Sequence, residues 1–191
     1  MIYKSYRKGD QLLEISQDLD PIDPRSWDNL GSMVCYHSRY NLGDSDHGID
    51  RSGLLDYMKN HKIKSCLNLY LYDHSGLTIN TSGFSCPWDS GQIGYIWATD
   101  QDIRENWGIK RISSKRREQV LRILESEVET YDQYLRGDTY GFNLYKIETC
   151  NLGHEHKINL NSCWGFYGDN FKENGLLCYA EIDDLRLWTE L

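Results

Sequence analysis

Residues 63–72 read IKSCLNLYLY, and this stretch decides the fold class of the 191-residue chain. Small or apolar side chains occupy every second position from Ile63 to Leu71, and the intervening positions are mostly polar or aromatic. A period of two is typical of a β-strand that has one face on the core. The turn Asp73-His74-Ser75-Gly76 follows, and residues 77–81 then return as a second strand. The sequence therefore predicts an antiparallel hairpin here.

Apolar periodicity in the rest of the chain predicts the other strands and helices. Strands are expected at residues 12–16, 33–37, 91–99, 139–149 and 158–167, and helices at 52–60 and 114–135. Thr99 stands three residues before Asp102, which predicts a helix start, and Asp169-Asn170 predicts the start of a last helix. These elements predict an α+β fold in which an antiparallel sheet of about five to six strands packs with three to four helices. No linker interrupts the chain, so we expect a single domain over residues 1–191.

Composition excludes several classes of function. The chain has 21 Lys and Arg against 29 Asp and Glu, a formal charge of −8, which makes nucleic acid an unlikely partner. The basic cluster at residues 110–117 is interpreted as a solvated helix end, although the helix dipole opposes bases there and so favours a partner-binding alternative. No apolar run approaches ~18 residues, so we expect no membrane contact. Without a CxxC pair or an apolar leader, the six cysteines indicate a reducing cytoplasm.

The turn at residues 73–76 is one candidate site. Asp73 and His74 place a carboxylate beside an imidazole, a combination that can bind a metal ion or move a proton. The structural alternative is a turn in which Asp73 caps backbone N–H groups.

A second candidate is the segment CPWDSGQ at residues 86–92. Cys86 is a possible nucleophile with His74 or His37 as its base. The interpretation that we favour is a loop anchored by a buried Trp88, with Asp89 and Ser90 hydrogen-bonded across a turn.

A third candidate begins at His37. On an extended segment, His37, Arg39 and Asn41 project to one side, where Arg39 is able to grip a phosphate or a carboxylate. Asp44, Asp46 and His47 follow closely, which makes a metal site conceivable. The alternative is an internal Arg–Asp pair that pins the loop.

Two cysteines and two histidines have the type and number of ligands of structural zinc. They are Cys150, His154, His156 and Cys163. Their spacing matches no standard zinc finger, so zinc or another divalent metal is a minor hypothesis and no cofactor is expected.

Four blocks are rich in Trp, Gly, Asp, His and Cys. They are residues 28–44 (DNLGSMVCYHSRYNLGD), 70–79 (YLYDHSGLTI), 84–96 (FSCPWDSGQIGYI), and 129–142 (ETYDQYLRGDTYGF) continued by 162–169 (SCWGFYGD). Together they resemble a family of accessory proteins of tailed bacteriophages and prophages that has no established activity. The resemblance implies a viral protein in the cytoplasm of a bacterial host. Such proteins often counter host defence, which favours inhibition by binding.

Two hypotheses of function follow. The first is a binding protein that engages a host protein or sequesters a small ligand, through Arg39, Tyr40, Asn41, Trp88, Ser90, Gln92 and Trp164. The second is a hydrolase of a nucleotide or phosphoester that uses His37, Asp44, Asp73, His74 and Asp89, with or without a divalent metal. Walker, GxSxG, HExxH and Rossmann motifs are absent from the sequence, which favours the first hypothesis.

Overall fold

The computed structural model describes residues 1–44 and 48–191, whose contacts group into two compact units. Unit 1 consists of Met1–Ile22 and Gly137–Leu191, and unit 2 consists of Asp23–Arg136. The predicted α+β class and the antiparallel pairing of the strands are confirmed. The strands divide between a five-stranded and a four-stranded sheet, because each hairpin pairs within its own unit. The interpretation of residues 1–191 as one domain stays a prediction.

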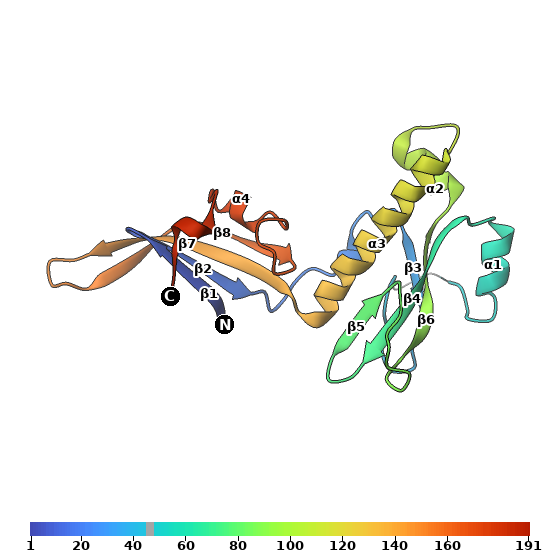
Figure 1. Ribbon diagram of the computed structural model, residues 1–191, viewed down its shortest axis with the longest axis horizontal. Helices are drawn as coiled ribbons and strands as arrows, with labels where there is room; N and C mark the ends of the chain where they lie inside the picture. Colours follow the sequence, from blue (N-terminus) through green and yellow to red (C-terminus); the bar gives the residue numbers. More distant parts are fainter. Residues whose placement is uncertain (45–47) are drawn as a thin grey trace. The chain divides into compact units, whose positions relative to one another are not determined.

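Unit 2 is built on the four-stranded sheet (Figure 1). Its strands are β3 (Ser32–Cys35), β4 (Ser65–Asp73), β5 (Leu77–Asn80) and β6 (Ser90–Ala98), in the spatial order β3-β6-β4-β5. Its helices are α1 (Leu54–Asn60), α2 (Asp100–Trp107) and α3 (Ser114–Arg136), with a short 3-10 turn at Pro24–Ser26. The predicted β4–β5 hairpin is confirmed, with Leu71 opposite Ile79.

The two faces of this sheet have separate cores. On one face, Met33, Leu69 and Ile96 pack with Leu124 and Val128 of α3, which crosses the sheet in Figure 1. The opposite face holds a smaller cluster in which Leu54 of α1 joins Val34 of β3 and Trp97 of β6. The period of 3.6 residues that predicts α3 is therefore the spacing of the side chains that it buries.

A buried ion pair fixes the start of unit 2 to α3 and to the loop after β3. The guanidinium of Arg25, 4% exposed, donates to Asp44 Oδ1 (2.8 Å), Glu127 Oε2 (3.2 Å) and the carbonyl of Gly31 (2.6 Å). Asp44 also accepts from the backbone N–H of Met33 at 2.8 Å. Burial raises the pKa of Glu127, and the charge of Arg25 opposes that shift.

The predicted helix starts near residues 99 and 114 are confirmed, with a simple local cause in each case. Thr99 and Asp102 form a capping box, in which each side chain accepts from the backbone N–H of the other residue. In the basic cluster, Arg117 pairs with Asp100 at 2.9 Å, and the guanidinium of Arg116 lies 4.6 Å from the ring centroid of Trp107. Part of the cluster is therefore engaged within unit 2.

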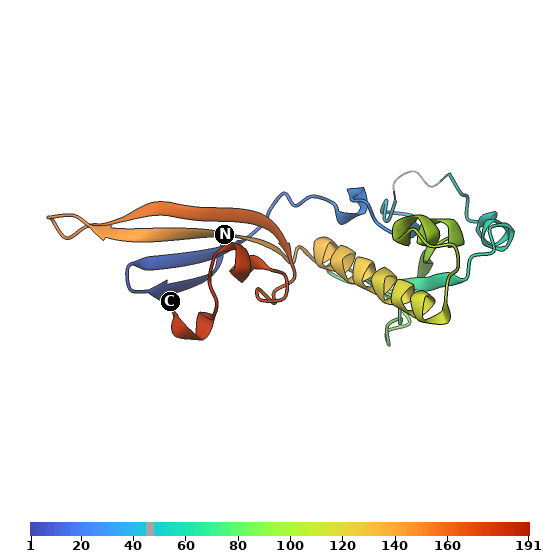
Figure 2. The same ribbon diagram turned by 90° about the horizontal axis from the view of Figure 1, so that it is seen from above.

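Unit 1 contains the five-stranded sheet, in the order β8-β7-β2-β1-β9. Its strands are β1 (Ile2–Lys8), β2 (Gln11–Gln17), β7 (Thr139–Thr149), β8 (Glu155–Tyr167) and β9 (Thr189–Glu190). The β7–β8 hairpin extends beyond the β1–β2 hairpin (Figure 2). The C-terminal segment, with α4 (Leu176–Tyr179) and a 3-10 turn at Leu185–Leu187, contributes Leu176 and Ile182 to the core against Leu13 and Phe142.

Two predictions of secondary structure are corrected in unit 1. The strand β1 is an addition to the predicted elements, because its sequence shows no clear alternation and only Tyr6 in it is buried. The last helix does not start at Asp169-Asn170, since it consists of four residues that follow Gly175. Gly175 has a φ of +87°, which lies outside the range of a right-handed helix and so delays the start. Among the described helices, none has the length and apolar character to cross a membrane.

Candidate functional site

The topology of unit 2 brings three of the sequence candidates to one end of the four-stranded sheet. Strand β6 lies between β3 and β4 and is antiparallel to both. The end of β3, the end of β4 and the start of β6 therefore share one edge of the sheet. The loop after Cys35, the residue Asp73 and the segment before Ser90 all meet there (Figure 1).

A pocket of about 310 Å³ lies at this edge. It is lined by His37, Arg39, Leu71, Asp73, Trp88, Asp89, Ser90, Gly91 and Ile93. Three segments of sequence that were separate candidates therefore form one site. We call it the Trp88 pocket.

One wall of the Trp88 pocket is an ion pair beside two stacked rings. Arg39 Nη2 donates to Asp73 Oδ2, and the guanidinium lies 5.4 Å from the ring centroid of Tyr40. The rings of His37 and Tyr40 stack at 5.1 Å, and the backbone N–H of Arg39 donates to His37 Nδ1 at 3.3 Å. These contacts orient the guanidinium of Arg39. Because its side chain is 65% exposed, the charge can still be reached from solvent. The internal Arg–Asp pair considered from sequence thus exists, with Asp73 as the partner of Arg39.

A second group of contacts in the site is built around Asp89. His74 Nδ1 lies 3.3 Å from Asp89 Oδ2, and Cys86 Sγ lies 3.8 Å from the same oxygen. The hydroxyl of Ser90 donates to the carbonyl of Cys86, and the backbone N–H of Asp73 donates to the carbonyl of Asp89 at 2.8 Å. These bonds close a turn over residues 86–90 and hold it against the end of β4. The predicted hydrogen-bonded turn is confirmed.

The prediction that a buried Trp88 anchors this turn is wrong. Trp88 is 91% exposed. It stands within the turn that Ser90 and Cys86 close, and nearly all of its side chain is open to solvent. A tryptophan so open to water gains almost nothing from burial in the folded chain.

Several other candidate residues lie elsewhere. Asp44 is not among the residues that line the pocket, because its carboxylate is bonded to Arg25 and to the backbone N–H of Met33. Asn41 is exposed but does not line it either, because the chain bends at residues 38–39 instead of running straight. Gln92 lines a neighbouring pocket. Asp46 and His47 lie outside the described residues.

Trp164 belongs to unit 1. It lies on β8 opposite Gly141, where a Cβ atom at residue 141 would approach the Trp164 ring to 2.2 Å. The glycine therefore provides the space for this half-exposed ring. This packing supports a structural role for Trp164 within the sheet.

The four residues of the zinc hypothesis are not brought together. Cys150 and His154 lie at the end of the β7–β8 hairpin, where Thr149 pairs with Glu155. Cys163 pairs with Phe142 and lies seven residues along β8 from His156, a distance of roughly 23 Å at 3.3 Å per residue. Among the described residues, no three His, Cys, Asp or Glu side chains are grouped to hold a metal ion.

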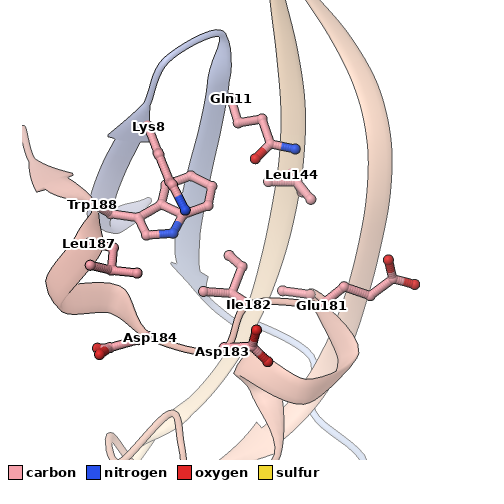
Figure 3. Close-up of a pocket in the computed structure, with 10 residues that line it drawn as sticks. Lys8, Gln11, Leu144, Glu181, Ile182, Asp183, Asp184, Leu187 and Trp188 are labelled. Carbon is pink, nitrogen blue, oxygen red and sulfur yellow. The ribbon is translucent and has the colours of Figure 1, made fainter.

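Unit 1 has a smaller pocket of about 190 Å³ (Figure 3). Lys8, Asp183 and Trp188 are among the residues that line it. The sequence candidates are not among its lining residues. It gives less room than the Trp88 pocket.

Sequence reasoning missed the apolar base of the Trp88 pocket. Leu71 and Ile93 are both buried and line it from below the charged rim. Ile93 is the extra residue of a β-bulge, because Leu69 pairs with Gly94 while Tyr70 pairs with Gln92. Bulges re-aim side chains beside functional sites. The glycines on either side of Ile93, Gly91 and Gly94, are the signal in the sequence that points to this irregular position.

In comparisons of the chain with protein-family models, with curated proteins and with solved structures, nothing matches. The resemblance to phage accessory proteins therefore stays a prediction.

Proposed function

We propose that this chain is a phage-encoded accessory protein that acts by binding, and that it engages a host protein with the rim of the Trp88 pocket. The observation that carries the proposal is the 91% exposure of Trp88 in a pocket that Arg39 also lines, with the Tyr40 ring beside the Arg39 guanidinium. Trp, Tyr and Arg are the residue types that most often dominate the affinity of protein interfaces. The acidic surface of the chain and the resemblance noted above support the same class of function.

The energy available at Trp88 is large enough to matter. A tryptophan side chain buries about 150–250 Å² when covered. Covering half of an exposed ~200 Å² corresponds to ~2.5 kcal/mol at 25 cal/mol per Å², or about 60-fold in affinity. Because the Trp88 ring is exposed in the free protein, almost all of its apolar surface remains to be buried by a partner.

The rest of the rim is ordered before binding. Arg39 is held by Asp73 and lies over Tyr40, and Tyr40 in turn stacks on His37. Side chains that are already fixed lose less conformational entropy when a partner arrives. This order supports recognition of a specific partner surface.

Matched variants of exposed apolar side chains test the proposal. Wild-type protein, Trp88→Ala and Leu152→Ala are immobilised, and a lysate of the bacterial host is passed over each. Leu152 is 83% exposed and lies in unit 1, so it controls for nonspecific apolar contact. We expect one host protein in stoichiometric amount on the wild type and on Leu152→Ala, and its loss on Trp88→Ala. Equal capture by all three, or by none, would contradict the proposal.

The alternative function, a phosphoester hydrolase, is favoured by one observation. His37, Asp73 and Asp89 line a single pocket, and His74 contacts Asp89. Each carboxylate already has a partner, Arg39 for Asp73 and His74 for Asp89, which is the weakness of this alternative. Turnover of p-nitrophenyl phosphate or nucleotides with Mg²⁺ or Mn²⁺, lost in both His37→Ala and Asp89→Asn, would establish the hydrolase instead. A small ligand sequestered in the pocket would bind without turnover and without retaining a protein.

A further inference from the structure

Unit 2 has a second pocket, on the face of the sheet that α1 covers. Its volume is about 320 Å³, and Tyr36, Arg51, Leu54, Leu55 and Tyr95 form its sides. Gln92, Ile93 and Gly94 of β6 complete its lining. The volume lies at the lower end of the range for small-molecule sites, about 300–1,000 Å³. Gln92 is the one binding candidate from the sequence among its described lining residues, and Arg39, Tyr40 and Trp88 do not line it.

The walls of this pocket are flat and fixed. Tyr95 pairs with Val34, and Tyr36 follows Val34 by two positions, so both tyrosines lie on the same face. The backbone N–H of Tyr36 donates to the carbonyl of Ile93 at 2.8 Å, and its hydroxyl donates to the carbonyl of Ile49 at 2.8 Å. Tethered at both ends, the Tyr36 ring is a rigid wall suited to the face of a flat apolar group.

The β-bulge at Ile93 shapes the remaining side. Gly94 can come close to β3 only because it has no side chain, since a Cβ atom there would lie 1.9 Å from the carbonyl oxygen of Val34. Residue 94 therefore presents backbone alone to the pocket, and the two tyrosines keep the space between them. Leu54, 4% exposed, closes the inner end.

The charge of Arg51 favours an anionic ligand in this pocket. Among the described residues that line it, Arg51 alone is charged. The nearby carboxylate of Asp50 accepts from the backbone N–H of Gly53 (2.6 Å) and from the hydroxyl of Ser52 (2.9 Å), so it serves the loop. A guanidinium at the mouth of an apolar pocket matches a carboxylate or a phosphate group, which it binds through paired N–H donors.

We propose that this pocket binds a small molecule that has a flat apolar body and a single negative charge. The body lies between Tyr36, Tyr95 and Leu54, and the anionic group contacts Arg51. The inference is independent of the proposed function, because it depends on another set of side chains.

Two probes that differ only in charge test the inference. Indole-3-acetate carries a carboxylate, and indole-3-acetamide replaces it with a neutral amide. The full chain is titrated with each probe, and amide shifts are followed by NMR. We expect saturable shifts at Tyr36 and at residues 92–95, with about tenfold tighter binding of the acetate, the effect of a hydrogen bond to a charged group. Absence of saturable shifts, or equal affinity for the two probes, would overturn the proposal, as would shifts confined to the Trp88 pocket.

Three variants assign the effect to Arg51. Arg51→Gln is expected to remove the preference for the acetate, while Lys59→Gln, a change at another exposed base of the α1 region, is expected to keep it. Gln92→Glu places a negative charge on the lining and is expected to weaken the acetate and leave the acetamide unchanged. All three positions are exposed, so the variants are expected to fold. A preference retained in Arg51→Gln, or lost in Lys59→Gln, would contradict the assignment.

Discussion

Replacing Arg25 is the substitution that tests the packing of unit 2 most severely. Its guanidinium is 4% exposed and has three partners, namely Asp44, Glu127 and the carbonyl of Gly31. In Arg25→Ala, two carboxylates are left close together, and one of them, Glu127, is only 12% exposed.

The expected cost can be worked from the exposure of each partner. Removing one side of a buried ion pair typically costs ~3–5 kcal/mol, because the other charge stays buried. Asp44 is 30% exposed and keeps its bond to the Met33 N–H, so water and the backbone stabilise part of its charge. We therefore expect a loss close to the lower limit, ~3 kcal/mol. Arg39→Gln is the matched control, because its Arg–Asp pair has a 65% exposed arginine and should cost less than ~1 kcal/mol.

Urea unfolding, followed through amide NMR signals of unit 2, measures both variants. A loss of ~3 kcal/mol at a slope of 1–3 kcal/mol per M moves the midpoint by about 1–3 M. In the double variant Arg25→Ala/Glu127→Gln, the second change should recover part of the loss, because it neutralises the unpaired carboxylate. The reasoning is refuted if Arg25→Ala is as mild as Arg39→Gln, or if the two losses simply add.

Three further predictions follow from backbone contact, thiol reactivity and alkaline stability. Gly94→Ala should cost ~2 kcal/mol or more in urea unfolding because its Cβ would meet a β3 carbonyl, while Gly91→Ala, with open space around it, should stay within ~0.5 kcal/mol; equal effects would contradict this account. At pH 8, iodoacetamide should modify Cys150 about 100-fold faster than Cys66. Backbone N–H groups lower the pKa of the Cys150 thiol, and burial raises the pKa of the Cys66 thiol to about 11. Peptide mass spectrometry measures the two rates, and faster modification of Cys66 would refute the prediction. Burial raises the pKa of Cys35 from 9.0 to about 12, so its contribution to stability is complete below pH 9 and is lost as pH rises towards 12. Urea midpoints between pH 8 and pH 11 should fall less in Cys35→Ala than in the wild type, and identical curves would count against this linkage.

Local pattern was sufficient to predict most of the fold. The β4–β5 hairpin and α3 repeat their apolar residues with the period of the element, and the side chains at those positions form the core. The strand β1 could not be predicted from apolar periodicity, because only Tyr6 in it is buried. It forms by pairing with β2. Gly175 stands within the segment where the last helix was expected, and its φ of +87° excludes a right-handed helix at that residue.

The candidate site was predictable in its members but not in its assembly. His37, Arg39, Asp73 and Asp89 are notable in sequence by residue type, but Arg39 and Asp73 are separated by 34 residues. They meet because β6 lies between β3 and β4, and this strand order is a long-range property that no local pattern contains. The exposure of Trp88 follows from the direction of one turn, which the bond from Ser90 to the Cys86 carbonyl sets.

If the proposed function is correct, a partner protein covers the rim of the Trp88 pocket. Hydrogen–deuterium exchange of the full chain, with and without the captured host protein, tests it directly. The account predicts slower exchange of the amides in residues 37–41, 73–74 and 86–91 on binding, with no change along β8. Protection confined to β8 or to another segment, with these three unchanged, would contradict it.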